Sequence, residues 1–330
     1  MSEDKVKVSG VTYNKQGSDY FEKRELKRSA GIWGLWGLAV AAVISGDFSG
    51  WNFGVAAGGF GGLLIAFGIL VVMYYGMMFA IGEMSAAMPH TGGAYSFARK
   101  AMGPWGGFVT GLAETIEYVA TTAVIVYFSA GYADAVTSEL LGFHMDAWIW
   151  WVVLYIAFIA LNSAGSAISF KFSIWVSFIS IAILLVFGIM VLVSGQFNWD
   201  SLWNITPDEG QTAFLPHGVL GILYAIPFGV WLFLGIEELP LAAEEAHDPA
   251  KHIPKAGFWA RGTLIFTGIL VMFANTGVLG AEATGSAGEP LLDGFRALVG
   301  DGWAAVLAIF ALIGLLASLQ GIMFAYGRNM

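Results

Sequence analysis

The chain has 330 residues, of which 57% are apolar and only 12% are charged, and its mean hydropathy is +0.71. A soluble domain carries about twice this charged fraction. The composition therefore excludes an ordinary soluble protein and predicts a helical protein that crosses a lipid bilayer several times. The absence of cysteine excludes disulfides and thiolate chemistry.

Several apolar segments are long enough to be membrane spans, because about 20 apolar residues cross the hydrocarbon core of a bilayer. A polar and charged tail precedes them at residues 1–29. We therefore expect an all-α polytopic membrane protein with eight spans, which lie near 30–57, 60–83, 104–131, 147–162, 168–194, 214–239, 257–280 and 302–326.

The basic residues fall almost entirely on one side of this arrangement. If the N-terminus is cytoplasmic, fourteen of the fifteen Lys and Arg residues lie on the cytoplasmic side, and only Arg296 lies outside. Lysine and arginine are enriched in cytoplasmic loops. The partition therefore predicts a multi-pass protein of the cell (cytoplasmic or inner) membrane with a cytoplasmic N-terminus, and it supports the count of eight spans.

Two of the spans are interrupted near their middles. The first contains SGDFSG at residues 45–50, and the sixth contains Pro227, Gly229 and Gly235, followed by Glu237. Glycine and proline weaken helices, and freed backbone groups are tolerated in a membrane only within protein or along a cavity. Broken helices in corresponding positions of two halves are typical of inverted-repeat transporters that bind their substrate at the bilayer midplane.

Two motifs are similar to those of the amino acid–polyamine–organocation superfamily of transporters. GIEELPLAAEEAHDPAKHIPKA at residues 235–256 resembles the sixth helix and the following loop of that superfamily. PHTGGAYSFARKAMGPWGGFVTGLAE at residues 89–114 resembles its second loop and third helix. Within the superfamily, SGDFSGWN at residues 45–52 and GIEELPLAAEE look most like ethanolamine permeases.

This resemblance implies an inverted-repeat fold of ten core helices in two five-helix repeats, with helices 1 and 6 discontinuous. The chain would then comprise a cytoplasmic tail at 1–29, the first repeat at 30–194, an extracellular loop at 195–213 and a partial second repeat with helices 6–8 at 214–330. We therefore expect a C-terminally truncated form of the family's core.

The first break carries a carboxylate, Asp47. In amino acid carriers of the superfamily, backbone N–H groups at this break hold the substrate carboxylate. An aspartate there repels a carboxylate and attracts an ammonium, and a bound cation would offset the cost of about 2.5–3.5 kcal/mol for an unpaired Asp near the bilayer centre. We therefore expect Ser45, Gly46, Asp47, Ser49 and Gly50 to bind a small cationic amine such as ethanolamine. The alternatives are that Asp47 pairs with a protein cation, or that it is protonated and caps the half-helix.

Four further residues belong to the expected site. The resemblance implies that Trp231 is an aromatic gate over the substrate, where it could also contact the ammonium by a cation–π interaction; Phe233 is a weaker aromatic candidate. Glu117, near the middle of the third span, is either a second ligand for the cation or a hydrogen-bond partner of a neighbouring helix. Glu237 matches a family acid linked to coupling, and the coupling ion, proton or sodium, stays open.

Other functional classes receive little support. The sequence contains no HExxH, GxSxG, phosphate-loop or Cys/His pattern, so we expect no enzyme, no cofactor, no bound metal and no nucleic-acid partner. Polar residues gather around the two breaks rather than along a continuous path, which disfavours a channel. We expect a secondary active transporter that imports ethanolamine or a similar small cationic amine by alternating access, with an amino acid permease of the same superfamily as the alternative. Its partners would be the amine, a coupling ion and the lipid bilayer.

Overall fold

The computed structural model describes residues 5–8, 11–14, 28, 30–88, 92–163 and 166–329. Most of the tail and the start of the second-loop motif, residues 89–91, lie outside this part. The elements in chain order are β1 (Lys5–Val8), β2 (Val11–Asn14), α2 (Ile32–Val43), α3 (Ser45–Phe48), α4 (Phe53–Ala87), α5 (Gly93–Leu141), α6 (Ala147–Ser163), α7 (Ser166–Ser194), η1 (Asp200–Trp203), α8 (Gly218–Val230), η2 (Ile236–Glu245), α9 (Pro249–Leu279), α10 (Ala281–Ser286), α11 (Pro290–Val299) and α12 (Asp301–Asn329).

The regular secondary structure of the described residues is helical apart from one short hairpin. Strands β1 and β2 pair antiparallel within the N-terminal tail, which the sequence analysis had not anticipated. Helices α4, α5, α7, α9 and α12 are long and apolar enough to cross a bilayer, and three shorter apolar stretches cover Ile32–Phe48, Ala147–Ser163 and Gly218–Val230. These stretches of the described residues match the eight predicted spans, so the prediction of an all-α polytopic membrane protein is confirmed.

Two long helices change direction at glycines with positive φ. Gly59 (φ +72°) divides α4, and Gly103 (φ +76°) divides α5 just before Pro104. Glycine adopts this left-handed conformation without the steric penalty of a Cβ. The turn at Gly59 separates the end of the first predicted span from the start of the second, and the turn at Gly103 marks the start of the third.

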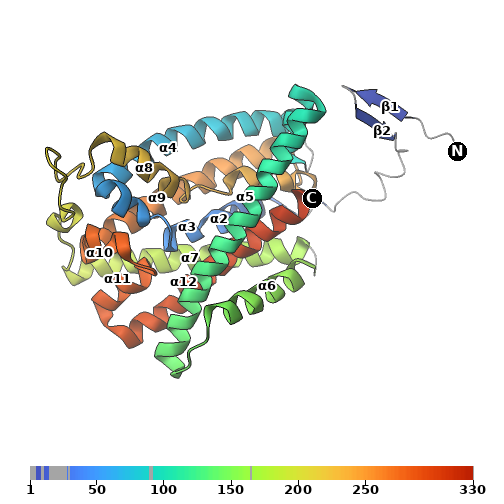
Figure 1. The fold of residues 1–330 in the computed structure, drawn as a ribbon. Coiled ribbons are helices and arrows are strands. Elements are labelled where there is room, and N and C mark those ends of the chain that lie inside the picture. The colour runs from blue at the N-terminus through green and yellow to red at the C-terminus, as the bar shows by residue number, and fades with distance from the viewer. Residues whose placement is uncertain are drawn as a thin grey trace.

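The first span occupies the interior of the bundle. In Figure 1, α2 and α3 lie at its centre, with α7, α9 and α12 around them, while α4 runs along α8 and α5 runs along α12. All residues of α2 from Gly34 to Val43 are buried. A short parallel bridge joins the two broken spans at one end, where the Ala30 N–H donates to the Glu245 carbonyl (2.9 Å) and the His247 N–H donates to the Ala30 carbonyl (3.0 Å). The helices thus bring both breaks into the core.

Candidate functional site

The first break lies between α2 and α4. After α2, a single turn of helix, α3, carries Asp47. Ser49 is then extended, and Gly50 has a φ of +97°, which favours glycine. Because the helix stops here, backbone N–H and C=O groups lose their helical partners and need others within the protein.

Side chains of two other helices satisfy these backbone groups. Ser318 on α12 accepts a hydrogen bond from the Ser45 N–H (2.8 Å) and donates one to the Ala41 carbonyl (2.7 Å). Tyr132 on α5 donates to the Phe48 carbonyl (2.9 Å). The Ala41 and Phe48 carbonyls therefore already have donors within the protein.

Asn52 ties the break to the segment that follows α9. Its Oδ1 accepts a hydrogen bond from the Gly50 N–H (3.1 Å), and its Nδ2 donates to the carbonyls of Thr284 (2.9 Å) and Ala287 (2.8 Å). The sequence pattern did not predict the roles of Asn52 and Ser318. Each has partners far away along the chain, and a lone amide or hydroxyl in an apolar segment gives no signal of such a partner.

Asp47 is buried without a charge partner. It is 1% exposed, and neither of its carboxylate oxygens has a hydrogen bond of normal geometry within the described part of the chain. The carboxylate faces α9, where Oδ1 lies beside Gly268 and the Thr267 side chain approaches it. The Thr267 hydroxyl also lies within hydrogen-bonding distance of the carbonyls of Thr263 (3.1 Å) and Leu264 (3.3 Å). Asp47 therefore retains acceptor capacity for a donor from outside the protein.

The second break lies between α8 and η2. Helix α8 ends at Val230, and the chain turns irregularly until Gly235, which has a φ of +101°. Pro227, which was predicted to interrupt the span, instead lies inside α8. Proline is tolerated within membrane helices where neighbouring groups satisfy the backbone that it frees. The interruption is thus centred on residues 231–235.

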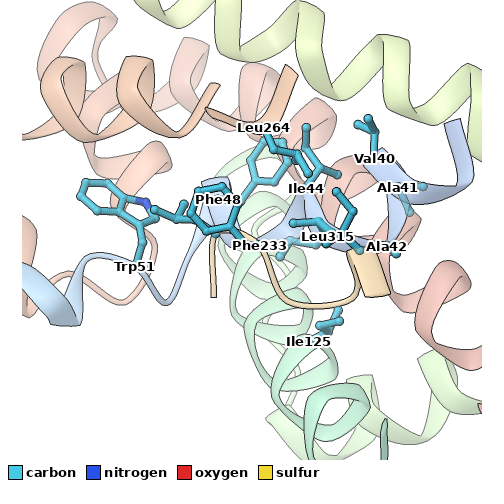
Figure 2. Packing of buried hydrophobic residues seen from close by; sticks show 14 of the residues in the cluster. Val40, Ala41, Ala42, Ile44, Phe48, Trp51, Ile125, Phe233, Leu264 and Leu315 are labelled. Atoms are coloured by element: carbon cyan, nitrogen blue, oxygen red, sulfur yellow. The ribbon is translucent and has the colours of Figure 1, made fainter. Parts of the chain in front are cut away.

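The two breaks touch each other directly. A Cβ placed on Gly46 would collide with the backbone carbonyl of Trp231, and one placed on Gly50 would come within 2.7 Å of the Trp231 ring. Figure 2 shows Phe48 and Trp51 of the first break in one buried cluster with Phe233 of the second. Glycine at position 46 therefore permits the two backbones to approach each other, and glycine at position 50 leaves room for the Trp231 ring.

The two aromatic candidates have different surroundings. Trp231 is half-buried, faces Gly50 and lies 6.5 Å from the ring of Phe128 on α5. Phe233 is fully buried and packs against the rings of Phe67 (5.2 Å) and Tyr74 (5.1 Å) on α4. Its contacts are those of a core residue, whereas Trp231 keeps a ring beside the break.

The acidic candidates lie at the start of η2 and on α5. Glu237 accepts a hydrogen bond from the Gly235 N–H (3.1 Å) through Oε1, so it caps the second break. The carboxyl group of Glu117 on α5 approaches that of Glu237 closely enough for a hydrogen bond between them. Glu238 is also buried, with 6% of its surface exposed. The contact of Glu117 is thus with Glu237, whereas Asp47 faces α9.

The segment between α9 and α12 packs over the first break. Gly285 of α10 packs against Ala56, and Asn52 binds carbonyls of the same segment. Arg296 of α11 forms ion pairs with Glu139 at the end of α5 and with Asp293 (2.7 Å). This basic residue, which the sequence analysis placed alone on the outer side, therefore fastens α11 to α5.

Known proteins are similar to this chain in sequence or in fold. A family model described as amino acid permease matches residues 34–330. The chain belongs to the amino acid permease family. The members of this family are permeases rather than enzymes, which agrees with the absence of a catalytic motif.

Individual relatives are distant from this member of the family. The chain is 28% identical to an uncharacterized transporter of Rhizobium meliloti, over 91% of this chain and 63% of the relative. It is 27% identical to the amino-acid permease RocC of Bacillus subtilis, over 82% and 58%, and 27% identical to a probable GABA permease of Pseudomonas aeruginosa, over 72% and 50%. The chain thus spans between half and two-thirds of the length of these relatives.

A solved structure shares the fold. The structure of Mhp1, a nucleobase-cation-symport-1 family transporter in a closed conformation with bromovinylhydantoin bound, matches with a TM-score of 0.51 at 15% identity. The match covers 93% of this chain and 72% of that one. The predicted transporter fold with two discontinuous helices is therefore confirmed. The finer resemblance to ethanolamine permeases is not matched by these relatives.

Proposed function

We propose that this permease is a secondary transporter that carries a small cationic amine without a carboxylate, ethanolamine or a close analogue, into the cell by alternating access. The amine would bind where the two breaks meet, with Asp47 as its counter-charge and Ser45, Ser49 and Trp231 beside it. The direct contact between the breaks would represent a closed form, and their separation would admit the substrate.

One observation carries this proposal. Asp47 is a buried carboxyl group at a helix break, and no cation in the described part of the chain pairs with it. A buried charge is costly unless it is paired. A substrate ammonium would supply both the missing charge and the missing hydrogen-bond donors.

The relatives favour a second candidate substrate, an amino acid. Several of them are named as amino acid permeases, among them RocC. An α-amino acid would bring a carboxylate close to Asp47, and two like charges about 4 Å apart repel by about 4 kcal/mol at an effective dielectric constant of 20. A cationic amino acid held by its side chain would avoid part of this repulsion. The choice between the two candidates therefore depends on Asp47.

Competition with radiolabelled ethanolamine, bound to the purified protein, tests the choice. Trp231 is one ring beside several acceptor groups, and a quaternary ammonium needs a cage of rings. We therefore expect choline to compete at least about tenfold more weakly than ethanolamine, a difference of about 1.4 kcal/mol, and alanine to compete more weakly still. Equal or stronger competition by alanine or arginine would favour an amino acid permease, and equal competition by choline would indicate an aromatic cage.

The proposed orientation places the N-terminus in the cytoplasm. Since the chain contains no cysteine, single cysteines introduced at Ser138 and Ala250 report each side without background. We expect a membrane-impermeant maleimide to label S138C from outside and A250C only after the membrane is opened. The reverse pattern would show that the topology is inverted.

A further inference from the structure

A cavity of about 300 Å³ lies between α4 and α9, away from the two breaks. Its lining includes Ala86 near the end of α4 and Ala250 near the start of α9, and these ends face the cytoplasm in the proposed orientation. The rings of Phe79 and Phe258 also line it and are largely exposed on the surface of the bundle. The cavity is therefore flanked by side chains that would face lipid.

The cavity wall contains a buried cation. Arg261 of α9 lines the cavity and is fully buried. Its Nε and Nη2 have no hydrogen-bond partner among the described residues, and Arg261 belongs to none of the ion pairs that these residues form. Its guanidinium lies 4.8 Å from the centroid of the Tyr75 ring, which also lines the cavity.

The contact with Tyr75 stabilises the charge of Arg261 by a cation–π interaction but gives its N–H donors no acceptor. A buried charge is costly unless it is paired and hydrogen-bonded. Glu237 attracts the guanidinium only from beyond ion-pair distance. Arg261 therefore retains donors for an anion that enters the cavity.

An acidic side chain lines the same cavity closer to the cytoplasmic end. Glu83 of α4 is exposed and takes part in no ion pair of the described residues. It lies about two helical turns, or about 12 Å along the axis, beyond Tyr75. From the membrane interior toward the cytoplasm, the cavity thus presents first a cation and then an anion.

A phosphate group followed by an ammonium matches this order of charges. The planar guanidinium of arginine binds phosphate oxygens through two parallel N–H···O bonds, and a carboxylate accepts hydrogen bonds from a primary ammonium. In a phosphoethanolamine headgroup, the phosphate lies nearer the acyl chains and the ammonium lies at the outer end. The exposed rings of Phe79 and Phe258 would then pack against the acyl chains.

We propose that this cavity binds a zwitterionic phospholipid of the phosphatidylethanolamine type, with its phosphate on Arg261 and its ammonium on Glu83. The site is separate from the amine site at Asp47 and does not depend on which substrate is transported. The bound lipid joins α4 to α9. Because Gly268 of α9 lies beside Asp47, the lipid stabilises the helix that packs against the first break.

Native mass spectrometry of the delipidated full chain in detergent tests the site. We expect titration with dioleoyl phosphatidylethanolamine to give one saturable adduct in the wild type, which Arg261→Gln weakens by at least about tenfold because the phosphate loses its charged donors. Ala86→Trp changes no charge and places a ring in the cavity from an exposed position, so it should weaken the adduct to the same extent. Wild-type affinity in both variants would overturn the proposal.

Two exposed positions outside the cavity provide matched controls. Arg99→Gln on α5 and Glu282→Gln on α10 should keep the adduct at wild-type strength. The lipid should also raise the melting temperature of the wild type, because a ligand that binds the folded state stabilises it, and should not raise that of Arg261→Gln. An equal rise in Arg261→Gln would show that the lipid stabilises the protein elsewhere.

The choice of headgroup tests Glu83 and the source of the phosphate. We expect the wild type to bind phosphatidylethanolamine more tightly than phosphatidylglycerol, which has no ammonium, and Glu83→Gln to lose this preference. A preference that Glu83→Gln retains would contradict the assigned role of Glu83. Inorganic phosphate and free phosphoethanolamine should displace the lipid only weakly. Displacement by either of them at the concentration of the lipid would show that the cavity takes a free phosphate compound, and would overturn the lipid assignment.

Discussion

Asp47→Asn is expected to lower the affinity for ethanolamine by at least about 100-fold, or about 2.7 kcal/mol, because losing one partner of a buried charge pair costs about 2–5 kcal/mol. The substitution keeps the size of the side chain and removes its charge. In the ligand-free protein, Asp47 has no charge partner in the described residues, so the same change should leave the melting temperature unchanged or raise it. Equilibrium binding and thermal unfolding in detergent measure the two effects.

Weaker ethanolamine binding without a lower melting temperature would show that the Asp47 carboxylate binds substrate and does not stabilise the fold. Asp301→Asn, at the exposed start of α12, is the matched control and should alter neither quantity. If Asp47→Asn lowers the melting temperature and leaves ethanolamine binding within about threefold of the wild type, or about 0.65 kcal/mol, Asp47 stabilises the break and does not bind the amine.

Gly46→Ala is expected to destabilise the closed form, because its new Cβ would collide with the Trp231 carbonyl. Backbone on both sides of this contact belongs to buried segments and cannot move aside as a flexible side chain does. Overpacking of a tight core costs about 1–3 kcal/mol. We therefore expect a clear fall in the melting temperature of the ligand-free protein, together with loss of transport.

Gly68→Ala is the matched control for this prediction. Gly68 lies in α4, beyond the turn at Gly59. A Cβ at this position would meet no atom within 4 Å. Because alanine favours a helix over glycine by about 1 kcal/mol, Gly68→Ala should be neutral or slightly stabilising. A Gly46→Ala protein as stable and as active as Gly68→Ala would show that the two breaks do not pack as described.

The sequence predicted the parts of the molecule that depend on local pattern. The lengths of the apolar segments predicted the positions of the spans. The SGDFSG segment predicted the first break, because glycine and serine weaken a helix wherever it lies. The interruption of the sixth span was predicted more broadly than it occurs, since Pro227 and Gly229 remain helical and, of the three interrupting residues, only Gly235 has a positive φ. Helices α10 and α11 were not predicted, because they are too short and too polar to form a span.

The residues that contact the candidate site are brought there by tertiary packing, so the sequence predicted fewer of them. Ser318, Tyr132 and Asn52 satisfy the first break through hydrogen bonds between distant segments, which no local pattern encodes. The burial of Arg261 follows from the face of α9 that turns toward Tyr75. A single arginine at the end of an apolar segment resembles the basic residues that flank a span.

The central claim is that Asp47 selects an amine without a carboxylate, and the ratio of ethanolamine to glycine affinity tests it most directly. The two ligands share an aminomethyl group and differ in a hydroxymethyl group against a carboxylate, so the ratio isolates the effect of the second charge. Isothermal titration of both ligands into the wild type and into Asp47→Asn gives this ratio twice. We predict that the wild type prefers ethanolamine and that Asp47→Asn loses this preference. A wild type that prefers glycine, or a preference for ethanolamine that Asp47→Asn retains, would contradict the account.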